Sequence, residues 1–140
     1  MIDHYSIKVG DVITPETGLE LCRHFGFDYL VERLEGNLDK YKSFVFDGVS
    51  GLPENLAALL VGVNERALTY KCALPHDLQF AYSQKGNKKE EAMANSDFYN
   101  NLINISVVPW KAWAALKIVE KGGAEELDLS FSFGFANKEI

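Results

Sequence analysis

Proline and glycine residues divide this sequence into segments of helix length, and these breaks constrain its fold more than any other feature. Thr14 and Pro15 have the pattern of a helix N-cap and a first helical residue, and Gly26 ends the segment that they open. A second short helix is expected over residues 27–34, with Gly36 as its stop. The N-terminal part of the chain therefore predicts two short helices in succession.

Helical spacing of apolar residues continues through the middle of the chain. Residues 56–61 indicate a brief apolar helix, and a longer helical pattern covers residues 65–82. Pro75 lies inside that pattern, so it either kinks one helix or begins a new one as its first residue. After the turn at Gly86, residues 88–105 repeat apolar side chains at core spacing and predict another helix. An antiparallel helical hairpin is the expected core.

The last predicted helix begins at Pro109 and ends at Gly122 and Gly123. Trp110 and Trp113 lie about one turn apart in it, and we expect them to pack in the core. The alternative is an exposed aromatic anchor, because Trp110 stands at the start of the helix.

Three segments carry the pattern of β-strands. Apolar and polar residues alternate over residues 5–9 and again over residues 127–135, and residues 44–46 are a short apolar run. These segments predict a small sheet made of an N-terminal strand, the strand of Phe44 to Phe46, and a C-terminal strand. The expected fold is therefore mainly α, in the α+β class, with the helical hairpin beside this sheet.

Size and charge limit the classes of function. The 140 residues, 47% of them hydrophobic, are expected to form one globular domain over residues 1–140. The 14 Lys and Arg residues against 20 Asp and Glu give a net charge of −6, which argues against nucleic-acid binding. We interpret the short basic run of Lys85, Lys88 and Lys89 as a solvated turn rather than a phosphate-binding patch.

Cys22 and Cys72 are the two cysteines of the sequence. No apolar signal-peptide segment precedes them, so we expect buried free thiols in a cytoplasmic protein, with a disulfide between them as the alternative. A transmembrane segment is not expected either, because no apolar stretch approaches the roughly 20 residues that cross a bilayer.

A histidine and an aspartate are placed to meet across the predicted helical hairpin. His76 and Asp97 each lie about ten residues from the turn at Gly86 and Asn87, so antiparallel helices return them to the same level. A carboxylate bonded to one imidazole nitrogen would fix the tautomer and leave the other nitrogen as a base. His76 and Asp97 are therefore the candidate catalytic pair, and a buried pair without catalysis is the structural alternative.

Asp77, Asp47 and Gly48 are the candidate ligands of a hard cation. On a helix the Asp77 side chain diverges from His76 by about 100°, so Asp77 needs a different partner. Asp47 follows the apolar run of residues 44–46 in a loop where Gly48 can turn its carbonyl inward. Two carboxylates and a carbonyl oxygen suit calcium, whereas zinc prefers more His and Cys ligands.

The order of these residues resembles the prokaryotic branch of the secreted phospholipase A₂ superfamily. That family has Asp-x-Cys-Ser, Cys-x-x-His-Asp and a later Asp-Phe where this chain has Asp47-Gly48-Val49-Ser50, Ala73-Leu74-Pro75-His76-Asp77 and Asp97-Phe98. The chain looks still more similar to an uncharacterised bacterial and phage family with Asp-Gly-Ala-Ser, His-Asp and Ala-Asp-x-x-Phe blocks and a helix that ends in Gly-Gly. The resemblance covers residues 44–123, approximately. Val49 and Ala73 replace the superfamily's cysteine pair, a change that suits a reducing compartment.

The resemblance implies a phospholipase A₂-like helical fold and calcium-dependent hydrolysis of a lipid or other small-molecule ester. In that scheme His76 activates a water, Asp97 orients His76, and Asp77, Asp47 and the Gly48 carbonyl hold calcium. The alternative is a non-catalytic accessory protein of a phage or mobile element, which keeps the scaffold and uses its surface to bind a protein partner.

Overall fold

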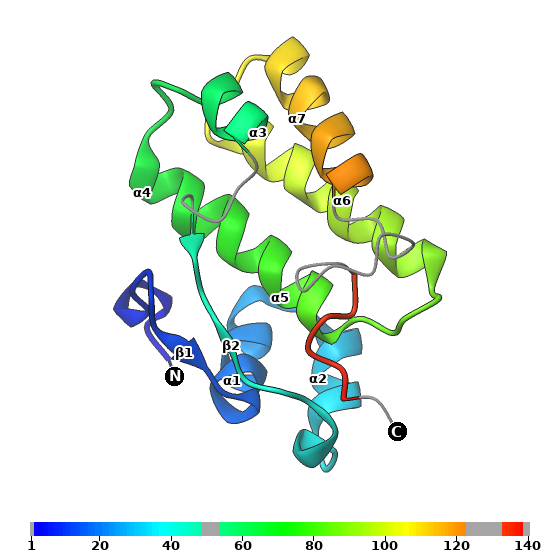
Figure 1. Cartoon of the computed structure of the whole chain (residues 1–140). Helices are drawn as coiled ribbons and strands as arrows, with labels where there is room; N and C mark the ends of the chain where they lie inside the picture. Colours follow the sequence, from blue (N-terminus) through cyan, green and yellow to red (C-terminus); the bar gives the residue numbers. More distant parts are fainter. Residues whose placement is uncertain (1, 49–53, 123–132, 139–140) are drawn as a thin grey trace.

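The computed structural model describes residues 2–48, 54–122 and 133–138, and it shows a mainly helical protein with a small two-stranded antiparallel sheet (Figure 1). In chain order the elements are η1 (His4–Ser6), β1 (Val12–Ile13), α1 (Pro15–Phe25), α2 (Asp28–Leu34), η2 (Leu38–Lys40), β2 (Phe44–Val45), α3 (Glu54–Leu59), α4 (Glu65–Leu68), η4 (Thr69–Ala73), α5 (Leu74–Tyr82), α6 (Lys88–Asn104) and α7 (Pro109–Gly122). The predicted helical class with a small sheet is confirmed.

Local capping explains where the first helices begin and end. The Thr14 side chain accepts a hydrogen bond from the Thr17 N–H at 3.2 Å, and Pro15 follows as the first residue of α1. Gly26 closes the helix with φ +75°, in the left-handed region that glycine adopts without strain. These observations confirm the predicted boundaries of α1.

Pro75 interrupts a helical run instead of starting a new helix. The run passes from α4 through the π-helical turn η4 into α5 without leaving helical backbone angles at Leu68, Ala73 or Leu74. Proline has no N–H to donate to the preceding turn, and the wider π-helical turn accommodates this loss directly before it. Of the two alternatives that the sequence left open, the interrupted helix is the one observed.

The predicted N-terminal strand over residues 5–9 is wrong. The Asp3 carboxylate accepts a hydrogen bond from the Tyr5 N–H at 3.0 Å and caps the 3₁₀ turn η1, so local side-chain bonding competes successfully with extended pairing. The strand β1 begins later, and its Val12 and Ile13 pair with Val45 and Phe44 of β2.

The predicted C-terminal strand lies partly outside the described residues, which exclude 127–132. Residues 133–136 form turns, and Asn137 then makes an isolated antiparallel bridge with Tyr41, close in sequence to β2. The described part of the tail therefore meets the chain just before β2 and adds a bridge, not a third strand.

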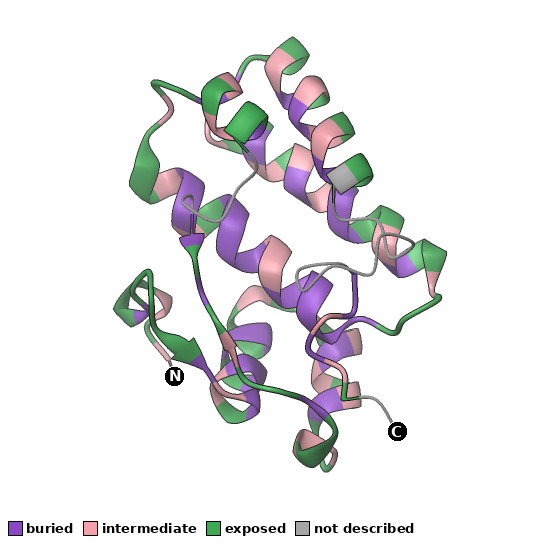
Figure 2. Cartoon of the chain, viewed as in Figure 1, coloured by how far each residue is buried: buried purple, intermediate pink, exposed green. Residues whose placement is uncertain are grey.

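The run from α4 to α5 lies between two hydrophobic clusters. One cluster packs α5 against α1, α2 and the sheet, and the other packs the π-helical turn η4 against α3, α6 and α7 (Figure 1). Figure 2 shows the consequence, since α5 is buried along most of its length. Helix α6 runs antiparallel beside α5, as the predicted hairpin requires (Figure 1).

Both tryptophans of α7 are exposed, so the prediction that they belong to the core is wrong. Trp110 is 64% and Trp113 is 58% exposed. The helix buries a different face, in which Ala112, Ala115 and Val119 pack in the cluster with α6. Small residues at this helical spacing allow close approach of the two helices, and this packing turns the tryptophans outward.

The two cysteines are free and buried, as expected for the thiol alternative. Cys22 lies in the cluster around α1, whereas Cys72 lies in the cluster around α6, and burial raises the pKa of each thiol to about 12. Among the described residues, no helix has the length and apolar character that a membrane crossing requires.

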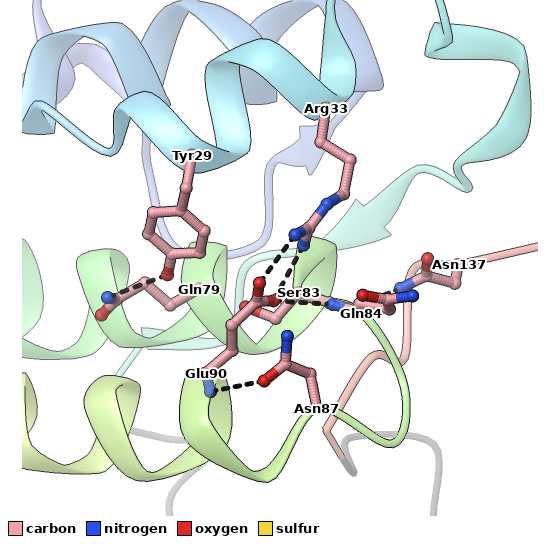
Figure 3. Close-up of polar contacts among 8 residues, drawn as sticks. All are labelled: Tyr29, Arg33, Gln79, Ser83, Gln84, Asn87, Glu90 and Asn137. Atoms are coloured by element: carbon pink, nitrogen blue, oxygen red, sulfur yellow. Dashed lines mark hydrogen bonds and ion pairs between the residues drawn. The ribbon is translucent and has the colours of Figure 1, made fainter.

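A partly buried ion pair ties α2 to the start of α6 (Figure 3). The Arg33 guanidinium donates to both Glu90 oxygens, at 2.8 and 2.6 Å, and the Gln84 N–H donates to the same carboxylate at 3.0 Å. The hydrogen bonds from Arg33 are the main reason that the pKa of Glu90 is lowered.

Glu90→Gln should lower the free energy of unfolding by about 2 kcal/mol at neutral pH, because Arg33 then keeps only a weaker, neutral partner. The pKa of Glu90 is lower in the folded than in the unfolded protein. The carboxylate therefore stabilises the fold above its unfolded pKa, and this contribution is lost as the pH falls through the folded pKa. Urea unfolding should show a difference in the free energy of unfolding between wild type and Glu90→Gln at neutral pH, and this difference should become smaller at acidic pH.

The exposed pair of Arg23 and Glu20 provides the control. Its atoms are also 2.8 Å apart, but the side chains are 46% and 48% exposed, so Glu20→Gln should change stability little. Equal losses for the two variants would show that burial of the Arg33 pair contributes nothing.

Candidate functional site

His76 is held in the seam between α5 and α6 by Asn95. The His76 Nε2 atom lies 3.1 Å from Asn95 Oδ1, and the ring centroid lies 4.3 Å from that of Phe80 and 4.9 Å from that of Phe98. An imidazole that donates from Nε2 to the Asn95 amide oxygen has Nδ1 as its acceptor nitrogen. Burial lowers the pKa of His76 to about 4, with the Asn95 hydrogen bond opposing the shift, so the ring is neutral at pH 7.

Asp97 lies on the other flank of the seam. Its Oδ2 atom accepts a hydrogen bond from Gln79 Nε2 at 2.9 Å. Residues 95 and 97 point about 200° apart on a helix, so α6 cannot present both to His76. The hydrogen bond to His76 that was expected from Asp97 is therefore made by Asn95, and a catalytic role for Asp97 stays a prediction.

Asn95 is the residue that sequence reasoning missed. It is buried and precedes Phe98 by three residues, so both side chains lie on the face of α6 that meets α5. A buried amide on a core face needs a hydrogen-bond partner, and His76 was the polar residue available across the hairpin. This requirement could have predicted the pair of His76 and Asn95 from the sequence, although a carboxylate is the more familiar partner of histidine.

Asp77 and Asp47 are close enough to repel each other. Burial of the carboxyl group and, as the smaller cause, the charge of Asp47 together raise the pKa of Asp77 to about 7. Asp47 is exposed in the segment after β2, and the next residue, Gly48, is buried with φ +59°. A Cβ at position 48 would lie 2.7 Å from the Val9 side chain, so this backbone conformation and this close approach both require glycine.

The donor set around Asp77 fits a hard cation better than a soft one. Two carboxylates and the backbone carbonyl of Gly48, the residue after Asp47, offer oxygen ligands, and a positive ion would remove the repulsion that contributes to the raised pKa of Asp77. Within residues 2–48, 54–122 and 133–138 no group of three or more His, Cys, Asp and Glu side chains is arranged to hold a metal. Val49 and Ser50 of the sequence motif lie outside these residues.

Comparison of the chain with protein families, curated proteins and solved structures found no match.

Proposed function

We propose that this protein is a calcium-dependent hydrolase of phospholipid-type esters, with His76 as the base and Asn95 as its positioning residue. The observation that carries the proposal is the His76–Asn95 hydrogen bond next to a pair of mutually repelling aspartates. The proposal includes the resemblance to the prokaryotic phospholipase A₂ branch and to the bacterial and phage family. It also includes the cytoplasmic location, for which the two buried free thiols are the support.

Asp77, Asp47 and the Gly48 carbonyl are the groups that would hold calcium. A calcium ion supplies a Lewis acid that polarises an ester carbonyl and stabilises the resulting oxyanion. Calcium takes six to eight oxygen ligands, so water or substrate oxygens would complete the set. The site would therefore bind calcium weakly when no substrate is present.

His76 can accept the proton of an attacking water at Nδ1. The neutral ring is available at every physiological pH, because its pKa of about 4 keeps it unprotonated. The same low pKa makes it a weak base, and the neutral amide of Asn95 cannot compensate the charge of the imidazolium as a carboxylate would. We therefore expect slow turnover with most of the rate enhancement coming from the oxyanion side of the site.

Calcium binding tests the proposal directly. Calorimetric titration of wild type should show binding at millimolar calcium that Asp77→Asn abolishes, while Asp39→Asn, a change at an exposed aspartate in η2, leaves it intact. Because the pKa of Asp77 is about 7, binding at that pH should release about half a proton per ion, seen as a dependence of the heat on the buffer. No binding at millimolar calcium would refute the calcium-dependent mechanism.

A non-catalytic accessory protein is the second candidate function, and the exposed tryptophans favour it. Trp110 and Trp113 lie about one turn apart on α7, with the ammonium groups of Lys111 and Lys117 at 5.7 and 5.4 Å from their rings. Exposed tryptophans are typical of protein interfaces. Absence of both calcium binding and ester hydrolysis would favour this candidate.

A further inference from the structure

A pocket lies on the Asp97 flank of α6, and neither His76 nor Asp77 lines it. Its volume of about 350 Å³ is within the range of small-molecule sites. The pocket is open to solvent on one side, and its lining comes from η1, the junction of α1 and α2, the π-helical turn η4, Pro75 of α5 and the C-terminal half of α6. The pocket is therefore distinct from the proposed hydrolytic site.

One wall of the pocket is aromatic. His4, Phe25, Phe27 and Tyr70 line it, and their rings contact one another, with centroid distances of 5.5 Å for His4 and Phe25 and 5.8 Å for Phe25 and Phe27. The Tyr70 hydroxyl donates to the Ile7 carbonyl at 2.6 Å, which fixes this ring. Burial, with the nearby His24 as the next cause, lowers the pKa of His4, so the wall carries no full positive charge at pH 7.

A polar part of the lining comes from one face of α6. Asp97, Asn101 and Asn104 follow one another at the spacing of successive helical turns. The Asp97 carboxylate accepts a hydrogen bond from Gln79, which is 1% exposed. The Gln79 side chain also donates to the Tyr29 hydroxyl at 3.3 Å. A buried amide therefore fixes the orientation of a carboxylate that faces the pocket.

Lys71 adds the opposite charge. It lines the pocket next to Tyr70, and both residues belong to the π-helical turn η4. Turns of this kind occur frequently at functional sites, because the extra residue changes which side chains the helix presents to one surface. The pocket thus combines aromatic side chains, a hydrogen-bonded carboxylate and a lysine side chain.

We propose that this pocket binds a small zwitterion that carries an alkylated ammonium group and an anionic group, the chemistry of phosphocholine. Ring faces attract organic cations, and Asp97 supplies the compensating charge. An alkylated ammonium needs few hydrogen bonds, which suits a wall of rings that cannot accept several of them. Lys71 would pair with the anionic group.

Calorimetric titration with phosphocholine, choline and inorganic phosphate tests this assignment on the full chain. Asp97→Asn should weaken both choline and phosphocholine by about tenfold, since it removes the charge but keeps an acceptor for Gln79. Lys71→Met should weaken phosphocholine and leave choline unchanged. Asp39→Asn is the control for a general loss of negative charge, and thermal unfolding checks that each variant is folded.

Several results would overturn the assignment. These are no binding of choline and phosphocholine at millimolar concentration, phosphate binding as tightly as phosphocholine, and an Asp97→Asn variant that binds like wild type. Phosphatidylcholine vesicles identify the source of the ligand. Vesicle binding that depends on Asp97 assigns the pocket to a lipid headgroup, and binding of soluble phosphocholine alone assigns it to the free molecule. Calcium titration of Asp97→Asn separates this result from the proposed hydrolysis, because that variant keeps Asp77 and Asp47.

Discussion

His76→Ala should reduce hydrolysis of phospholipid esters by at least about a hundredfold, while calcium binding stays at the wild-type level. The reason is that the proposed base lies at His76 but the proposed calcium ligands are Asp77, Asp47 and the Gly48 carbonyl. Release of fatty acid from vesicles measures the activity, and calorimetry measures the calcium binding. A His76→Ala variant with wild-type activity would remove His76 from the mechanism and leave it as a structural residue of the seam.

Asn95 variants separate positioning from stability. Asn95→Ala should lower kcat with little change in KM, because the ring loses the partner that orients it. Compared with Asn95→Ala, Asn95→Asp should restore activity. It should also raise the pKa of His76 in the pH profile of kcat, since a carboxylate stabilises the imidazolium. Asn100→Ala, at an exposed position of the same helix, is the matched control. If the profile does not move in Asn95→Asp, Asn95 has only a structural role.

Gly18→Ala should lower the free energy of unfolding by about 3 kcal/mol, although alanine is normally the better helix former by about 1 kcal/mol. Gly18 is buried in α1, and a Cβ there would overlap the Tyr82 hydroxyl and lie 2.6 Å from Tyr82 Cζ. The Tyr82 ring is fully buried and packs against Tyr41 and Phe44, so it has little room to move. Urea unfolding measures the loss.

The Tyr82 hydroxyl provides an internal check on this prediction. It is buried without a hydrogen-bond partner in the described part of the chain, so Tyr82→Phe alone should cost little. Combined with Gly18→Ala, it removes the worst overlap and should recover part of the lost stability. A Gly18→Ala variant more stable than wild type would show that α1 and α5 can separate at this contact without cost.

Helix boundaries were predictable because their causes lie close together in the sequence. Thr14 caps α1 through a residue three positions away, and Asn87 caps α6 through Glu90 in the same manner. Glycine at position 26 and proline at position 109 act within a single turn. A pattern of this kind needs no knowledge of the rest of the fold.

The incorrect predictions concern segments whose local pattern permits more than one structure. The alternating residues 5–9 could form a strand only with a partner strand beside them. The Asp3 side chain instead caps a 3₁₀ turn at residues 4–6. Trp110 and Trp113 have the size of core residues, yet the alanines of α7 fit closer to α6. A local hydrogen bond therefore decided the first case, and packing between α6 and α7 decided the second.

For the candidate site, the sequence by itself determined the chemistry of the groups: one histidine, a following aspartate, and an Asp-Gly pair that precedes them in the chain. Only the tertiary structure decided their partners. The rotation of α6 about its axis turns Asn95 toward His76 and Asp97 toward Gln79 and the pocket. That rotation is set by the apolar side chains that α6 buries on several sides, and no local pattern around residue 97 contains this information.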